Sequence, residues 1–364
     1  MAKYTIAEMC QKILAVQAAL REKKSAAEAY KSAGVTSATY KRWLSASPKL
    51  SLPSFVLDAP HNGDVALSRD GKWLVVVADT VEGFTLSRFD TTHGALDATT
   101  LVRAPRGGSD WREVLCVTAN ADGARVMFVA TDGALHEWDV ARNEVRVRSI
   151  DLRGRGASLD GKSSSGPRRW ANVAISPDLA HVAFWADIGK MSDAGPSYLH
   201  VLRVEDATEV LRREFASLFI PAQIVFHPTQ PRVAVRDTNN IVHVFDYTLD
   251  RSVVERGPQV HGLSFADDDT MLYDDWYGYT QEFDLTTGES RKLSKAWGSI
   301  ASASDRFVTA EEKLVTVRSR SNAKRARAIP FEGVRGCLLS RDGERLVIVA
   351  DKVCLWNLGA PTSD

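Results

Sequence analysis

Cysteine is scarce in this sequence, and the few cysteines fit no metal site. Only four occur among 364 residues, and no two are close enough to form a ligand pair. They are Cys10, Cys116, Cys337 and Cys354. We therefore expect free thiols in the reducing cytoplasm, with no bound metal and no disulfide framework.

Long apolar segments are also absent. No run of about 18 apolar residues occurs, so we expect no membrane span and no membrane partner. Glu8, Gln11 and Lys12 lie where a signal peptide needs its apolar stretch, so we expect no signal peptide. Both observations agree with a cytoplasmic location.

The motifs of common enzyme classes are missing as well. The sequence contains no G-x-S-x-G elbow, no H-E-x-x-H helix and no EF-hand loop, and its eight histidines are scattered singly. Gly156–Ser163 matches the P-loop expression, but Gly166 and Pro167 follow where the phosphate-binding helix must begin. We therefore expect no catalytic residues and no cofactor.

Charge is distributed unevenly, although the formal net charge is zero. Residues 1–50 hold nine Lys and Arg against three Glu, an excess of six positive charges. The remaining residues carry the opposite excess. A small basic module joined to a larger acidic one is a pattern that favours contact with nucleic acid.

Two nearly identical phrases stand at opposite ends of the chain. Ala66–Asp79 reads ALSRDGKWLVVVAD and Leu338–Asp351 reads LLSRDGERLVIVAD. Ser-Arg-Asp-Gly is typical of a tight turn, and the following β-branched run is typical of a buried strand. Five weaker copies begin near Thr118, Ile175, Phe226, Phe265 and Ser302.

Each copy is followed by a third expected strand with a common ending. The endings are Asp90, Asp139, Arg203, Asp246, Asp284, Arg318 and Asn357. The gaps between them are 49, 64, 43, 38, 34 and 39 residues. A period near 40 residues, with about four strands in each unit, indicates the blades of a β-propeller.

An acidic residue follows the second strand of every copy. A ring of carboxylates suggests a metal or catalytic site, but an Asp also caps the tight turn into a third strand, and we adopt that structural interpretation. The residues are Asp79, Asp132, Asp187, Asp237, Asp275, Glu311 and Asp351.

The copy at Asp132–Asp139 reads DGALHEWD and ends in a Trp-Asp pair. On these residues the chain resembles the WD40-like β-propeller family, with YVTN- and TolB-like propellers as near relatives. The resemblance implies an all-β, seven-bladed propeller. Since the last blade lacks an outer strand, we expect Ser54–Pro60 to supply it and to close the ring. The expected domains are a helical module (1–45), a linker (46–53), the propeller (54–359) and a tail (360–364).

The first 45 residues follow a helical pattern instead. Apolar residues recur at helical spacing from Ile6 to Leu20, and Ser25–Glu28 forms a capping box for a second helix. Gly34 ends that helix, and Thr36 or Ser37 caps a third.

Ala27–Leu44 resembles the helix-turn-helix of transposases and related bacterial and phage proteins. The resemblance implies that residues 25–45 bind duplex DNA. It also implies that the protein does so as a homodimer or together with a partner. The implied DNA-facing residues are Ser37, Thr39, Tyr40, Lys41 and Arg42. The alternative is a small helical bundle that docks another protein subunit.

Three long segments, two of them rich in arginine, fall on one face of the expected propeller, because inter-blade linkers and second-to-third-strand loops share a side. They are 103–113, 153–170 and 187–197. Arginine and aromatic residues on long loops are typical of a binding surface. We predict a protein-binding site formed by Arg106, Trp111, Arg112, Arg153, Arg155, Lys162, Arg168, Arg169 and Trp170.

These features together predict a non-enzymatic, DNA-associated adaptor. Its propeller would hold a protein partner, and its helices would bring DNA to that partner. Two alternatives stay open: a pure protein scaffold, and a propeller hydrolase or lyase acting at the mouth of the channel.

Overall fold

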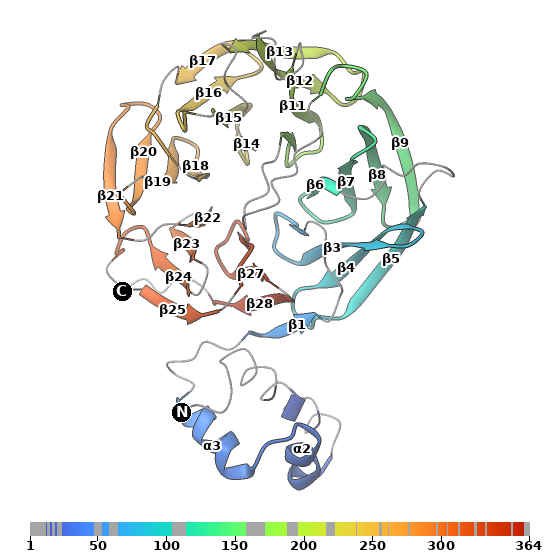
Figure 1. The fold of residues 1–364 in the computed structure, drawn as a ribbon, viewed down its shortest axis with the longest axis vertical. Helices are drawn as coiled ribbons and strands as arrows, with labels where there is room; N and C mark the ends of the chain where they lie inside the picture. Colours follow the sequence, from blue (N-terminus) through green and yellow to red (C-terminus); the bar gives the residue numbers. More distant parts are fainter. Residues whose placement is uncertain are drawn as a thin grey trace.

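The strands form seven four-stranded antiparallel sheets, arranged as blades around a central channel (Figure 1). The computed structural model describes Lys12, Ala15, Val16 and Ala19, and the ranges 24–46, 53–57, 65–103, 114–157, 172–187, 196–215, 223–237, 239–254, 257–260, 262–275, 277–295, 298–303, 305–311, 314–323, 326–331, 333–350 and 352–359. The predicted seven-bladed propeller is confirmed for these residues.

Each of the first four blades is built from consecutive strands, numbered outward from the channel. Blade 1 contains β2 (Val65–Leu67), β3 (Trp73–Thr80), β4 (Gly83–Asp90) and β5 (Leu96–Arg103). Blade 2 contains β6 (Val114–Ala119), β7 (Arg125–Ala130), β8 (Ala134–Asp139) and β9 (Glu144–Asp151). Blade 3 contains β10 (Val173–Ile175), β11 (His181–Asp187), β12 (Ser197–Arg203) and β13 (Glu209–Phe215). Blade 4 contains β14 (Gln223–Phe226), β15 (Arg232–Arg236), β16 (Val242–Asp246) and β17 (Arg251–Val254).

The remaining blades follow the same order, except that the outer strand of the last comes from upstream. Blade 5 contains β18 (Leu263–Asp267), β19 (Thr270–Asp274), β20 (Thr280–Asp284) and β21 (Ser290–Ser294). Blade 6 contains β22 (Ser299–Ala303), β23 (Arg306–Glu311), β24 (Leu314–Ser319) and β25 (Ala326–Pro330). Blade 7 contains β26 (Gly336–Leu339), β27 (Arg345–Val349), β28 (Val353–Asn357) and β1 (Phe55–Leu57).

The pairing of β1 with β28 closes the ring, as the sequence predicts. Phe55 lies opposite Leu355, and Leu57 lies opposite Val353. The hydroxyl of Ser54 also accepts a hydrogen bond from the backbone N–H of Asn357 at 2.8 Å. Closure covers a strand edge that would otherwise offer unpaired backbone groups to another chain.

Apolar side chains of neighbouring blades pack against each other. Leu57, Val347 and Leu355 of blade 7 form one buried cluster with Leu74 and Val76 of blade 1. This is why the second strand of blade 1 is an unbroken apolar run: both faces of its sheet are covered by a neighbouring blade.

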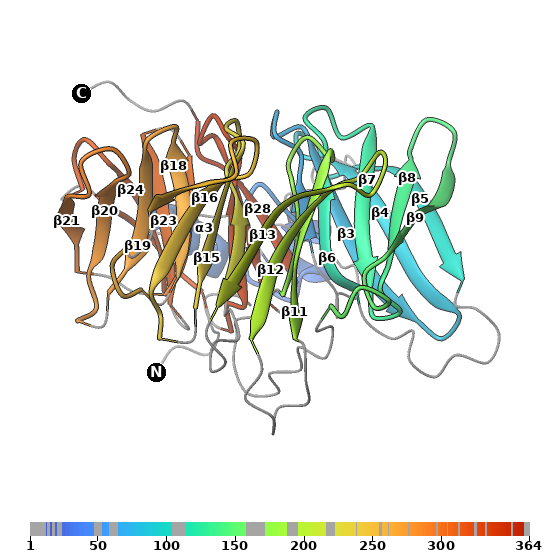
Figure 2. The same cartoon turned by 90° about the horizontal axis from the view of Figure 1, so that it is seen from above.

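Repeated side-chain bonds hold the turn between the first and second strands. In blade 1 the Ser68 hydroxyl donates to the Asp70 carboxylate at 2.6 Å and accepts from the Trp73 backbone N–H at 2.9 Å. Blades 3 and 7 make the same pair of bonds with their own serine and aspartate. These turns and the third-to-fourth-strand turns share one face, named here the turn face. The strand ends that lead from one blade to the next lie on the other, the loop face (Figure 2).

The acidic residues after the second strands confirm the turn interpretation only in part. Asp132, Asp237 and Asp275 each accept hydrogen bonds from backbone N–H groups of the following turn. In blade 1 the interpretation is wrong, because strand β3 continues through Asp79. There the Thr80 hydroxyl bonds to the Gly83 carbonyl and bridges the turn instead.

Within residues 24–46, which the structure describes without a gap, two short helices precede the propeller, α2 (Ala26–Ser32) and α3 (Ser37–Ala46). The predicted capping box is present, since Ser25 and Glu28 exchange side-chain and backbone hydrogen bonds. Gly34 takes a φ of +61°, and Thr36 caps α3 by accepting from the Thr39 backbone N–H at 3.1 Å. Most of the first predicted helix lies outside the described residues, but the four described there are helical.

The three described cysteines, Cys116, Cys337 and Cys354, form no disulfide. Burial raises the pKa of the Cys337 thiol to about 12, so it stays protonated and unreactive inside blade 7. None of the described helices has the length and apolar character needed to cross a membrane.

Replacing a core residue of the closing strand is expected to destabilise the whole ring. Leu57 is 6% exposed, so Leu57→Asp places a carboxylate in the seam between blades 7 and 1. We expect the free energy of unfolding to fall by about 3 kcal/mol or more, measured by urea denaturation. Leu96→Asp is the control, because Leu96 is 56% exposed on an outer strand. Equal effects of the two changes would contradict closure by β1.

Candidate functional site

The helical module presents part of its predicted DNA-facing surface. Ser37, Lys41 and Arg42 are exposed on α3, and Thr39 is half-buried with its hydroxyl bonded to that of Thr36. These positions follow from the cap at Thr36, which fixes where α3 begins and therefore which side chains its first turns present.

The prediction that Tyr40 faces DNA is wrong. Tyr40 is 6% exposed and packs in a small core with Val16 and Ala29. The ring of Tyr30 explains the difference, because its centroid lies 5.3 Å from that of Tyr40. A large residue at position 30 provides an apolar surface that draws the Tyr40 ring into the interior of the module.

The loop face brings together the ends of the predicted arginine-rich segments. The outer strands β5 and β9 both end there, as does β11, the second strand of blade 3. Arg153 donates to the Thr131 carbonyl of the loop face at 2.6 Å, whereas Arg155 reaches away from this face and donates at 3.3 Å to the carbonyl of Ala207, in the third-to-fourth-strand turn of blade 3. Both side chains are exposed, so they are fixed at one end and accessible to a partner.

The other predicted residues of the loop face lie outside the described residues. They are Arg106, Trp111, Arg112, Lys162, Arg168, Arg169 and Trp170. The structure therefore neither supports nor contradicts their role, and the protein-binding site stays a prediction.

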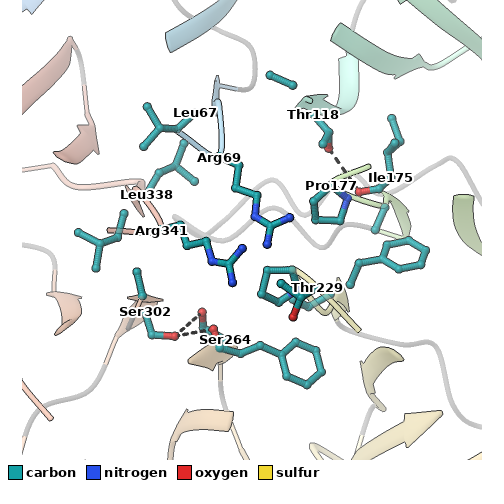
Figure 3. Close-up of a pocket in the computed structure, with 18 of the residues that line it drawn as sticks. Leu67, Arg69, Thr118, Ile175, Pro177, Thr229, Ser264, Ser302, Leu338 and Arg341 are labelled. Atoms are coloured by element: carbon teal, nitrogen blue, oxygen red, sulfur yellow. Dashed lines mark hydrogen bonds between the residues drawn. The ribbon is translucent and has the colours of Figure 1, made fainter. Parts of the chain in front are cut away.

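The channel opens on the turn face into a cavity of about 960 Å³. First strands and their turns from all seven blades line it. Figure 3 shows the guanidinium groups of Arg69 and Arg341 pointing into the open centre, with Pro177 and Thr229 on the far side. Within the described part of the chain, neither guanidinium has a hydrogen bond or an ion pair.

Bonds between neighbouring blades fix the wall of this cavity. The Ser302 hydroxyl of blade 6 contacts both the Ser264 hydroxyl and the Phe265 carbonyl of blade 5 at 2.9 Å. On the far side, Thr118 of blade 2 donates to the Ile175 carbonyl of blade 3 at 3.5 Å. These bonds join blade 5 to blade 6 and blade 2 to blade 3 along the cavity wall.

Three aspartates from the blade 5 turn face the same opening, and they already have partners. Asp268 accepts hydrogen bonds from the Thr229 hydroxyl at 2.6 Å and from Gln230 at 3.2 Å, which lower the pKa of its carboxyl. The other two form ion pairs, Asp267 with Arg320 (2.7 Å) and Asp269 with Arg232 (3.3 Å).

Sequence reasoning missed Arg69 and Arg341, although they lie inside the two phrases that revealed the repeat. Both arginines occupy the same position in a Leu-Ser-Arg-Asp-Gly turn, and closure of the ring makes the two blades that carry these turns neighbours. These two facts together could have indicated the site. The predicted partner site rests on the longest loops, which leave the opposite face.

Comparisons with known proteins support the architecture. No protein-family model matches the chain, and no curated protein does. The β-propeller domain of Myceliophteria thermophila Cps50 (Swd1) superposes with a TM-score of 0.58 at 12% identity, covering 84% of this chain and 100% of that one. At this identity the likeness shows the fold alone, a β-propeller.

The buried His227 ring is expected to make stability depend on pH. Its Nδ1 accepts from the backbone N–H groups of Thr229 and Gln230, and its Nε2 lies 2.9 Å from the Asp267 carbonyl. Burial lowers the pKa of His227 below 6.5, so the unfolded chain binds a proton more readily. The stability associated with neutral His227 is therefore complete above the unfolded pKa of about 6.5 and is lost as the pH falls below it.

The measurement is an NMR titration of the ring, assigned with the His227→Gln variant, together with urea denaturation across the same pH range. We expect a midpoint below that of a free histidine, and a smaller loss of stability in the variant. A midpoint at or above the ordinary value contradicts this account.

Proposed function

We propose that this chain is a non-enzymatic scaffold whose propeller holds a protein partner on the loop face. The observation that carries the proposal is that the strands leading into three long segments, two of them rich in arginine, all end on this face. A rigid ring that carries long segments on one face is suited to recognition, since the frame fixes where the segments begin and end. We place its action in the cytoplasm, where thiols stay reduced.

The geometry of Arg153 and Arg155 supports this function. Each donates to a backbone carbonyl and still exposes charge, so less side-chain freedom is lost when a partner binds. The bond from Arg155 to Ala207 also connects the linker after blade 2 to blade 3. One partner could thus contact two blades at once.

Reversing both charges is expected to abolish capture of the partner. We expect Arg153→Glu with Arg155→Glu to reduce, by at least about tenfold, the protein that co-purifies with the tagged chain, because a like-charged contact opposes association. Arg142→Glu is the control, since Arg142 is an exposed arginine of the turn face. Unchanged capture by the double variant, with an unchanged melting temperature, would exclude these arginines from the interface.

A second function, DNA binding by the helical module (residues 1–45), is favoured by one observation. Ser37, Lys41 and Arg42 are exposed on α3, directly after a short connection that contains Gly34. We propose that this surface contacts duplex DNA, and that a homodimer or a partner provides a second contact.

Removing the two α3 cations is expected to weaken DNA binding. In a gel-shift assay, Lys41→Ala with Arg42→Ala should lower affinity uniformly across sequences and reduce the salt slope by about two, as expected for two lost phosphate contacts. Lys31→Ala, an exposed lysine of α2, is the control. If the intact chain shifts no DNA at low salt while its helices remain folded, the module binds another protein instead.

A further inference from the structure

The two most similar repeat copies place an arginine at the same position in two turns. The phrase Leu-Ser-Arg-Asp-Gly occurs at Leu67–Gly71 in blade 1 and at Leu339–Gly343 in blade 7. In both turns the serine and aspartate bond to each other and to the backbone, and the arginine between them makes no such bond. The corresponding position holds Ala121, Pro177 and Pro228 in blades 2, 3 and 4.

Ring closure brings these two turns into contact. Gly71 has a φ of +71°, and a Cβ atom there would lie 2.8 Å from the Cβ of Ser340. The turns can pack this closely only because residue 71 lacks a side chain. Arg69 and Arg341 therefore enter the cavity from adjacent points on its rim (Figure 3).

The cavity has the size and lining of a small-molecule site. Its volume of about 960 Å³ lies within the range of known ligand pockets. Much of the wall is apolar, formed by Leu67, Ile175 and Phe226 among others. An apolar wall lowers the local dielectric constant, so a guanidinium there attracts an anion more strongly than it does on an open surface.

The positive charges of Arg69 and Arg341 are not neutralised by the carboxylates on the opposite wall of the cavity. The aspartates of blade 5 are bonded to Thr229, Gln230, Arg232 and Arg320, as described above. Arg69 and Arg341 have no such partner among the described residues, and they converge although they carry the same charge. An anion between them would relieve the repulsion and satisfy their N–H donors.

We propose that the channel mouth on the turn face binds a small organic anion bearing phosphate or carboxylate groups, held by Arg69 and Arg341. Arginine suits this role because its planar fork of donors matches both groups in a bidentate geometry. The site lies on the face opposite the proposed protein-binding surface. Anion binding at this site requires no partner protein. An experiment that finds no anion binding therefore leaves the proposed protein-binding function untouched, and the converse also holds.

Calorimetric titration of the full-length chain tests the proposal, with pyrophosphate and citrate as separate probes. The pyrophosphate titration reports phosphate recognition, and the citrate titration reports carboxylate recognition. We expect the wild-type chain to bind at least one probe. Arg69→Gln with Arg341→Gln should weaken that binding by at least about tenfold, because two charge-assisted interactions are lost. Either single variant should give a smaller loss.

A charge-matched control separates this site from general attraction of anions. Arg142 is exposed in the third-to-fourth-strand turn of blade 2, and Arg251 is exposed at the start of β17, next to the same turn of blade 4; both lie on the turn side, at a distance from the channel along their blades. Arg142→Gln with Arg251→Gln removes the same charge, and we expect affinity to stay within about twofold of the wild type. Circular dichroism and melting temperature verify that both double variants fold.

Three results would overturn the proposal. The first is that wild-type protein binds neither probe. The second is that both double variants lose affinity equally, which would indicate a nonspecific field. The third is binding confined to an acidic peptide, which would make the channel mouth a protein-docking surface.

Discussion

The antiparallel pairing of β1 with β28 is the contact on which the other features depend. A ring of sheets has no exposed seam only if its first and last blades are joined, and three residues, Phe55–Leu57, provide that join. Their pairing covers the open edge of β28 and completes the apolar contact with blade 1. It also makes neighbours of two turns that are about 270 residues apart in sequence.

The position of each surface follows from this closure. Alternation of strand direction sends every blade-to-blade linker to the loop face and every first turn to the turn face. The strand ends that flank the long predicted partner-binding segments thereby share one side, and the arginines at the channel mouth occupy the other.

Much of this architecture could be predicted, because local patterns encode it. The period near 40 residues gave the blades, and the missing outer strand of the last blade predicted the role of Phe55–Leu57. The capping box at Ser25 and the helix end at Gly34 were also correct, since both are set by a few adjacent residues.

The errors arose where distant residues decide the outcome. Tyr40 is buried by a contact with Tyr30 that no helical periodicity reveals. The convergence of Arg69 and Arg341 depends on which blades become neighbours and on which way a turn side chain points, and only the folded ring supplies both. The partner-binding segments of the loop face stay a prediction, because most of their residues lie outside the described ranges.

Hydrogen exchange at the amides of β1 tests the central claim most directly. If β1 closes the ring, its amides open only when blade 7 opens, so Phe55–Leu57 and Val353–Asn357 should show similar protection under native conditions. Fast exchange of Phe55–Leu57 alongside slow exchange of the rest of the propeller would contradict closure. It would also remove the structural basis for the shared arginine site.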